Sequence, residues 1–167
     1  MNKINQRINI AVNIAIVLVV VLIGIVAARN YLPSLRHRNY HVAAGSNVSL
    51  AGVDWRKNEQ TLLLVLDTKC AYCKASAPFY RELARAAAQN RGVQLVAVLP
   101  QDIQESKQYL SDLNVPIDDV RQSSFDLLGV QGTPTLILVN QNGKVEQSWP
   151  GKLPPDGETE VLKRIED

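Results

Sequence analysis

The sequence predicts an α/β fold in which helices flank a mixed sheet, preceded by one N-terminal transmembrane helix. Three observations lead to this prediction. Short apolar runs alternate with helical patterns, which is typical of parallel strands joined by helices. An Asn-Gly turn joins two later runs, and this is the strongest short-range signal of an antiparallel hairpin. A separate apolar segment near the N-terminus is long enough to span a bilayer.

The first strand and helix of the globular region are predicted between residues 62 and 90. Residues 62–66 (Leu-Leu-Leu-Val-Leu) form a continuous apolar run, which predicts a fully buried strand. From residue 72 to about residue 90 the apolar positions recur with helical spacing. Pro78 lies inside this stretch, and we expect it to kink the helix or limit its first turn.

A second strand and helix follow. Residues 93–99 are mostly apolar and predict a strand. Asp102 and Glu105 have the spacing of a capping box, so we expect the next helix to begin there and to end near Asn114. Because two parallel strands need a crossover, these elements predict a βαβ unit.

The last third of the chain predicts a hairpin and a final helix. Residues 135–139 form a third apolar strand, residues 140–143 (Asn-Gln-Asn-Gly) form the turn, and residues 144–149 form the returning strand. After two prolines at 154–155, apolar residues within 161–165 lie on one side of a helix. The predicted order is strand, helix, strand, helix, strand, strand, helix.

The N-terminal apolar segment covers residues 8–28 and contains no charge. About 20 apolar residues span the hydrocarbon core of a bilayer, so the segment predicts a transmembrane anchor. A cleaved signal peptide is the alternative, because Val26-Ala27-Ala28 fits the small-residue cleavage rule. The apolar stretch exceeds the roughly 7–15 residues of a signal-peptide core, which favours the anchor. We therefore expect a tail at 1–7, the anchor at 8–28, a linker at 29–46 and a folded domain at 47–167.

Charge is unevenly placed along the chain. Residues 1–46 carry five basic and no acidic residues, whereas residues 47–167 carry 13 basic and 16 acidic residues, a net charge of −3. A folded domain with this balance lacks the basic surface of a nucleic-acid-binding protein. Basic residues stand on both sides of the apolar segment, so charge alone does not orient the anchor.

The two cysteines of the chain form a C-x-x-C motif, Cys70-Ala71-Tyr72-Cys73, between the first predicted strand and its helix. The two-residue gap lets both sulfurs meet around the first helical turn. The partial positive charge of a helix N-terminus favours the nucleophilic thiolate, and Lys69 adds a formal charge beside it. This setting predicts reversible thiol–disulfide chemistry.

Three features together resemble the thioredoxin-like superfamily over residues 47–167. The first is the C-x-x-C motif at 70–73, the second is Pro78 in the helix that follows, and the third is Gly132-Thr133-Pro134-Thr135 before the third strand, which resembles the family's cis-proline loop. Together with the predicted anchor, the chain resembles a membrane-anchored bacterial thiol–disulfide oxidoreductase.

This resemblance implies a role for each motif residue. Cys70 would be the exposed nucleophile that forms a mixed disulfide with the substrate, and Cys73 would resolve it. Pro134 would be cis, and Thr133 would offer its main chain to an extended substrate segment. The resemblance also implies an active-site rim, which we assign to Lys69, Ala71, Tyr72, Thr133 and Pro134.

The resemblance also implies partners and a location. The substrates would be cysteine-containing envelope proteins, and a membrane electron donor or acceptor would restore the Cys70–Cys73 pair. The redox-active disulfide would be the reactive group, with no separate cofactor and no metal. We expect a single-pass protein of the bacterial inner membrane, with its domain facing the periplasm or cell exterior. Reduction of substrates is the expected direction, and oxidation or isomerisation by the same fold is the alternative.

A second hypothesis is a non-catalytic domain that binds a metal or a protein. A zinc site would need four ligands, and His37 and His41 are the histidines that could join Cys70 and Cys73. Both histidines fall in the predicted linker, which favours the redox interpretation.

The sequence departs from thioredoxin proper at several positions. Lys69 stands where thioredoxin has a tryptophan, and Ala71-Tyr72 replaces its Gly-Pro dipeptide. Leu64 stands where thioredoxin has a buried acid that accepts the proton of the second cysteine. A tyrosine before the second cysteine is similar to glutaredoxins and to envelope disulfide isomerases, although no separate dimerisation domain accompanies it here.

Overall fold

The computed structural model describes residues 12–24, 26 and 41–166, and the chain divides into two compact units at Asn39 and Tyr40. In the N-terminal unit, residues 12–24 are helical. Among the described residues, no helix combines the length and the apolar character that a bilayer crossing requires. The predicted tail at 1–7 and parts of the predicted anchor (8–28) and linker (29–46) lie outside the described residues.

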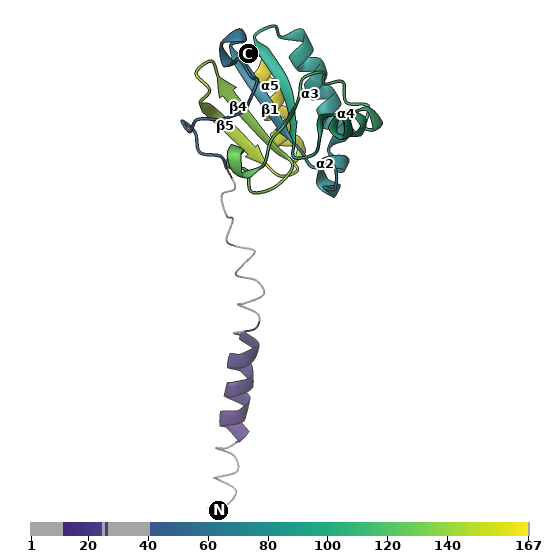
Figure 1. Cartoon of the computed structure of the whole chain (residues 1–167). Helices are drawn as coiled ribbons and strands as arrows, with labels where there is room; N and C mark the ends of the chain where they lie inside the picture. The colour runs from purple at the N-terminus through teal and green to yellow at the C-terminus, as the bar shows by residue number, and fades with distance from the viewer. Residues whose placement is uncertain (1–11, 25, 27–40, 167) are drawn as a thin grey trace, which may run out of the picture. The chain divides into compact units, whose positions relative to one another are not determined.

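The C-terminal unit contains one five-stranded mixed sheet with the strand order β3-β2-β1-β4-β5 (Figure 1). β1 pairs in parallel with β2, and β2 with β3, whereas the β1–β4 and β4–β5 pairs are antiparallel. The mixed sheet predicted from the sequence is therefore confirmed. The strands are β1 (Gln60–Val65), β2 (Val93–Leu99), β3 (Val120–Gln122), β4 (Thr135–Asn140) and β5 (Val145–Pro150).

β3 was not among the predicted strands. It has three residues, Val-Arg-Gln, and one of them is exposed. A strand this short, with one apolar residue, shows no periodicity that distinguishes it from a loop. It exists because its backbone pairs with the end of β2, where Ala97 is opposite Val120.

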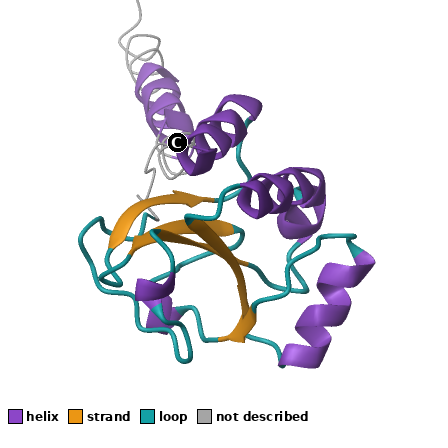
Figure 2. Cartoon of the chain, turned by 90° about the horizontal axis from the view of Figure 1, so that it is seen from above, coloured by secondary structure: helices purple, strands orange, loops and turns teal. Residues whose placement is uncertain are grey.

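The helices are α2 (Ala71–Ala75), α3 (Ala77–Gln89), α4 (Ile103–Asp112) and α5 (Pro155–Glu166). The single helix predicted over 72–90 is divided at Ser76. Pro78 lies in the first turn of α3, where backbone N–H groups have no partner within the helix, so the missing N–H of proline costs no hydrogen bond. The Asp102 side chain caps α4 by accepting hydrogen bonds from the Gln104 and Glu105 main-chain N–H groups. Figure 2 shows the helices and the sheet from above.

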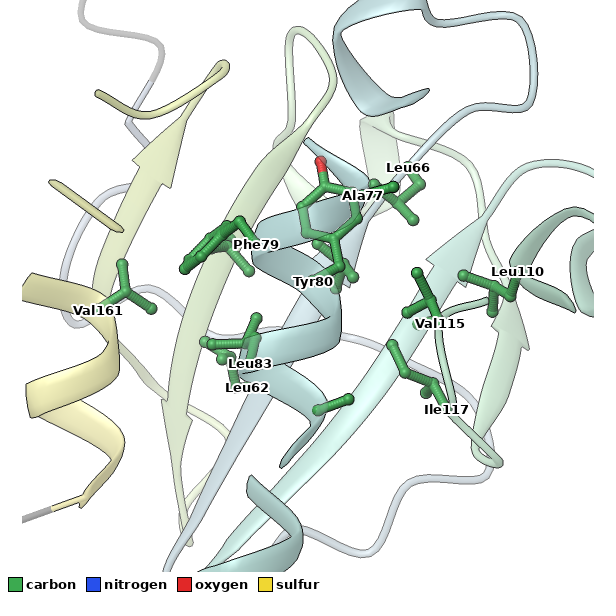
Figure 3. Packing of buried hydrophobic residues seen from close by; sticks show 14 of the residues in the cluster. Leu62, Leu66, Ala77, Phe79, Tyr80, Leu83, Leu110, Val115, Ile117 and Val161 are labelled. Carbon is green, nitrogen blue, oxygen red and sulfur yellow. The ribbon is translucent and has the colours of Figure 1, made fainter. Parts of the chain in front are cut away.

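Alternating residues of the central strands place apolar side chains on both faces of the sheet. On one face, Leu62 of β1 and Leu138 of β4 pack against α3 and α5, as Figure 3 shows for Leu62, Leu83 and Val161. This explains why residues 62–66 form an unbroken apolar run, since both faces are covered.

The other face is covered by the segment that precedes the sheet. Val42, Val48 and Leu50 pack there against Leu63 and Val139. Residues 41–46, predicted as linker, therefore belong to the compact unit, which begins before the predicted start at residue 47. The Gly45 N–H donates to the Val145 carbonyl and the Val145 N–H donates to the Ser46 carbonyl, and these bonds hold the segment along β5. The sequence shows no helical or alternating pattern here because the segment pairs through isolated contacts.

Candidate redox active site

The candidate site lies where the end of β1 and the beginning of β4 meet. These two strands are antiparallel neighbours, and Val65 is opposite Thr135. The chain leaving β1 therefore passes beside the loop that enters β4. As a result, Cys70 and Thr133, which are 63 positions apart, come into hydrogen-bond contact.

A tight turn after β1 positions Cys70 at the start of α2. The Asp67 carboxylate accepts a hydrogen bond from the Lys69 N–H at 2.8 Å, and the Asp67 carbonyl accepts one from the Cys70 N–H at 3.1 Å. Aspartate favours such turns because its side chain bonds the backbone two residues on. Cys70 thereby becomes the N-cap residue of α2.

The Cys70 sulfur makes two hydrogen bonds. It accepts one from the Cys73 main-chain N–H at 3.1 Å, as a capping side chain does at a helix N-terminus. It donates one to the Thr133 carbonyl at 3.3 Å. Both cysteines are free thiols in this structure. This contact places the sulfur next to the partial positive charge of the first helical turn.

The loop before β4 presents its backbone to this sulfur. The Thr133–Pro134 peptide bond is cis. Pro134 is buried and Thr133 is half-buried. Hydrogen bonds on either side fix the loop, from the Thr135 hydroxyl to the Gly132 carbonyl at 2.7 Å and from the Gly151 N–H to the Pro134 carbonyl at 2.6 Å.

The two thiols differ in burial and in acidity. Cys73 is fully buried, and burial together with the Cys70 contact raises its pKa to about 12. Burial also acts to raise the pKa of Cys70, but hydrogen bonding with Cys73, with the Thr133 side chain and with the Tyr72 backbone outweighs it and lowers that pKa below its ordinary value. Cys70 is the more accessible of the two cysteines, and at a given pH a larger fraction of it is present as the thiolate.

The predicted rim residues lie near Cys70 but differ in their exposure to solvent. Lys69 and Ala71 are exposed, and the Tyr72 side chain is 66% exposed. Together with Thr133 they form the accessible surface near the sulfur, whereas Pro134 is covered. The structure therefore places the whole predicted set in one region, at the turn of α2 and the loop before β4.

Sequence reasoning missed a group of hydroxyls on the buried side of the site. Ser76, Tyr80 and Tyr109 each have a hydroxyl that is buried and without a hydrogen-bond partner in the described part of the chain. Tyr80 and Tyr109 interact electrostatically with Cys73. Helical spacing could have placed Ser76 and Tyr80 on the face of Cys73, but nothing in the sequence places Tyr109 there.

The zinc alternative finds no ligand set in the described residues. No group of three or more His, Cys, Asp or Glu side chains there is arranged to hold a metal ion. His41 instead makes a hydrogen bond through Nδ1 to the Ser148 carbonyl at 2.8 Å. His37 lies outside the described residues.

The family model for the thioredoxin-like domain matches residues 55–166. The chain belongs to this family. A comparison with curated proteins finds no match.

Solved structures with the same fold include two thiol:disulfide interchange proteins and the protein StoA. A thiol:disulfide interchange protein from Bacteroides sp. is 19% identical with a TM-score of 0.59, covering 75% of this chain and 92% of that one. A thiol:disulfide interchange protein of the thioredoxin family from Chlorobium tepidum is 16% identical with a TM-score of 0.56, covering 75% and 99%. StoA from Bacillus subtilis is 18% identical with a TM-score of 0.53, covering 73% and 96%. At these levels of sequence identity, the structural similarity establishes a shared fold.

The difference in acidity predicts selective alkylation of the reduced chain. Iodoacetamide reacts with thiolates, so at neutral pH we expect it to modify Cys70 and to leave Cys73 unmodified. Because the pKa of Cys70 is lowered, the alkylation rate of Cys70 should reach half of its maximum at a lower pH than the alkylation rate of a cysteine in the denatured chain. Mass spectrometry of digested protein measures both sites. Faster modification of Cys73 would contradict the assignment.

Proposed function

We propose that the chain is a protein thiol–disulfide oxidoreductase with Cys70 as nucleophile and Cys73 as resolving cysteine. The observation that carries this proposal is the pairing of an accessible, more acidic thiol at a helix N-terminus with a buried, less acidic thiol three residues later. The named activities of the similar structures from Bacteroides sp. and Chlorobium tepidum support it.

The reaction consists of two exchanges. The Cys70 thiolate attacks one sulfur of a substrate disulfide, forms a mixed disulfide and releases the other substrate sulfur as a thiolate. Cys73 then loses its proton and attacks the Cys70 sulfur, which forms the Cys70–Cys73 disulfide and releases the second substrate thiolate. The substrate disulfide gains two electrons, and the cysteine pair loses two. The reverse sequence oxidises a substrate dithiol.

The loop before β4 offers a place for the substrate backbone. The Thr133 carbonyl already accepts a hydrogen bond from Cys70, and the Thr133 residue is half-buried, so an extended segment passing over Cys70 could pair with its main chain. Proline at 134 contributes no N–H, which leaves the pairing to Thr133. Tyr72, exposed between the two cysteines, provides apolar surface beside this path.

A trapping experiment tests the assignment of the two cysteines. In the Cys73→Ser variant the mixed disulfide on Cys70 has no resolving thiol, so partner proteins should accumulate as adducts that dissociate on reduction. Non-reducing electrophoresis and mass spectrometry identify them. The matched Cys70→Ser variant should trap at least tenfold less, because Cys73 is fully buried and its pKa is about 12. Trapping that depends on Cys73 instead of Cys70 would contradict the proposal.

We propose reduction of substrates as the physiological direction, supplied with electrons by a membrane donor. The oxidising direction, with a membrane acceptor, is the second candidate. The lowered pKa of Cys70 favours this oxidising direction, because a stabilised thiolate stabilises the reduced form and makes the disulfide more oxidising.

A redox equilibrium titration of the full chain distinguishes these directions. The Cys70–Cys73 state is measured against buffers of defined thiol–disulfide ratio. A potential near about −270 mV, as in thioredoxin, is expected for a reductant. A potential between about −120 and −180 mV would mean that the chain is an oxidase or isomerase. Failure to form an intramolecular disulfide would contradict the enzymatic proposal itself.

We also propose that residues 8–28 anchor the chain in the bacterial inner membrane, with the domain outside the cytoplasm. Residues 12–24 are helical, and the large apolar side chains described in residues 12–24 and at Val26 are 51–63% exposed. A contiguous apolar surface of this kind marks a site that lies against a membrane or a partner. Envelope proteins that contain cysteine pairs would then be within reach of the site.

A fusion experiment tests the topology. Alkaline phosphatase attached after residue 167 is active only outside the cytoplasm, so the fusion is expected to be active and to remain with the membrane fraction after washing with high salt. Replacement of Val19 and Val20 by lysine should release the active fusion or abolish its export, since charges at the centre of a bilayer are costly. An inactive fusion of the native sequence would contradict the proposed orientation.

A further inference from the structure

The Cys73 thiol must lose its proton before it can resolve a mixed disulfide, and its surroundings oppose that loss. Cys73 is fully buried, and its pKa is about 12. Leu64, also fully buried, belongs to the same apolar cluster and stands where thioredoxin has a buried proton-accepting acid. The polar groups that remain near Cys73 therefore decide how the proton leaves.

Ser76 and Tyr80 follow Cys73 at helical spacings, three and seven residues on. The division between α2 and α3 does not interrupt this arrangement, since the Ser76 N–H donates to the Tyr72 carbonyl at 3.1 Å and the Tyr80 N–H donates to the Ser76 carbonyl at 3.2 Å. Residues at such spacings share one face of a helix. Ser76 is 4% exposed and Tyr80 is 2% exposed, so this face is buried.

The two hydroxyls on this face are unsatisfied. The hydroxyls of Ser76 and Tyr80 lie close enough to interact, yet neither has a hydrogen-bond partner of good geometry among the residues that the structure describes. Figure 3 shows the Tyr80 hydroxyl oxygen pointing away from Leu83, toward the side of the molecule where Leu66 follows β1. A buried hydroxyl without a partner is costly, so such groups usually bind an ordered water.

A small cavity adjoins these hydroxyls. It has a volume of about 10 Å³ and is lined by Ser76, Phe79, Tyr80, Pro134, Leu136, Gly151 and Leu153. This volume is close to the minimum that one water molecule needs, and a buried water also needs two or more polar partners. Ser76 and Tyr80 supply two. Neither cysteine lines the cavity, so the two hydroxyls are the groups that connect it to the face of Cys73.

The other titratable groups that face Tyr80 are Cys70 and Cys73, at the start of α2, and Tyr109 of α4. Burial raises the pKa of Tyr80, and the negative charge of a Cys73 thiolate raises it further. The nearby Ser76 side chain acts in the opposite direction, and Tyr109 of α4 and Cys70 make smaller raising contributions. Tyr80 therefore keeps its proton and acts as a hydrogen-bond donor. Cys73 also interacts with the Asp67 backbone and with the Thr133 side chain, and the negative charge of the Asp67 carboxylate acts on Tyr109.

We propose that Ser76, Tyr80 and one water held between them form the proton route of Cys73 and replace the missing carboxylate. This inference rests on the proposed function. Both residues act as positioning residues. The Cys73 proton passes by way of these hydroxyls and the water to solvent, while the Cys73 sulfur bonds to Cys70 and the substrate sulfur leaves with the electron pair of the broken bond. The hydroxyls stabilise the Cys73 thiolate through the water while it forms.

The reaction of the reduced full chain with dithiobis(nitrobenzoate), in a nonionic detergent, tests this route without a natural substrate. Cys70 attacks the reagent and releases one coloured thionitrobenzoate. Cys73 then attacks the resulting mixed disulfide and releases the second. The rate of the second release, followed from mildly acidic to mildly alkaline pH, measures how readily Cys73 ionises. The rate of the first release measures Cys70 and serves as an internal reference.

Loss of either hydroxyl should slow the second step alone. Tyr80→Phe retains the ring, and Ser76→Ala retains the helix. In each we expect the second release to slow about tenfold to a hundredfold at neutral pH, the effect of a lost hydrogen bond to a charged group. The pH profile of the second step should move to higher pH. The first release should remain unchanged.

The matched control is Ser148→Ala. Its hydroxyl is also buried and donates to the Val42 carbonyl at 3.1 Å, but Ser148 is opposite Ile137, which belongs to the apolar cluster on the other face of the sheet. This variant loses a buried hydroxyl and some stability, yet both release rates should match those of the native chain. An equal slowing in Ser148→Ala would mean that destabilisation explains the effect, and it would overturn the proposal.

Two further results are decisive. If Tyr80→Phe and Ser76→Ala retain the native circular dichroism and release the second product at the native rate at every pH, the proton route is wrong while the oxidoreductase function stands. If the native chain itself releases only one product, Cys73 does not resolve the mixed disulfide, and the proposed function fails with the inference.

Discussion

The antiparallel pairing of β1 with β4 is the constraint on which the site depends. Both strands lie in the centre of the sheet, and their register places the exit of β1 beside the entrance of β4. The contact between Cys70 and Thr133 follows from this register. A slip by one residue would turn the alternating apolar side chains of β4 to the wrong faces, so burial on both faces fixes the register. The packing of the core thereby determines the geometry at the sulfur.

Most of the fold could be predicted because its signals are local. The Asn-Gly turn, the Asp102 cap and the apolar runs each determine structure within a few residues, and the structure has these features where the sequence indicated them. β3 and residues 41–46 could not be predicted in this way. They are held by backbone pairing with β2 and β5, which are distant in the sequence, and their own side chains have no periodicity.

In the candidate site, too, some residues could be predicted from local sequence and others could not. The C-x-x-C motif and the loop at Thr133–Pro134 are evident in the sequence because each is a short run of unusual residues. The buried hydroxyls are not, since serine and tyrosine are common in ordinary helices. Tyr109 comes from α4, and only the packing of α4 near α2 and α3 brings it near Cys73. The residues that react are thus predicted by their type, whereas the residues that tune them are known only from their positions in space.

The short helix α2 ends at Ala75, and the longer α3 begins after Ser76 and supplies most of the buried contacts of this stretch. Ala71 and Tyr72 are exposed and belong to neither apolar cluster. Side-chain substitutions at the two positions between the sulfurs should therefore cost the folded domain little stability. A substitution at either position changes the surroundings of the two sulfurs while the sheet and α3 continue to specify the same domain.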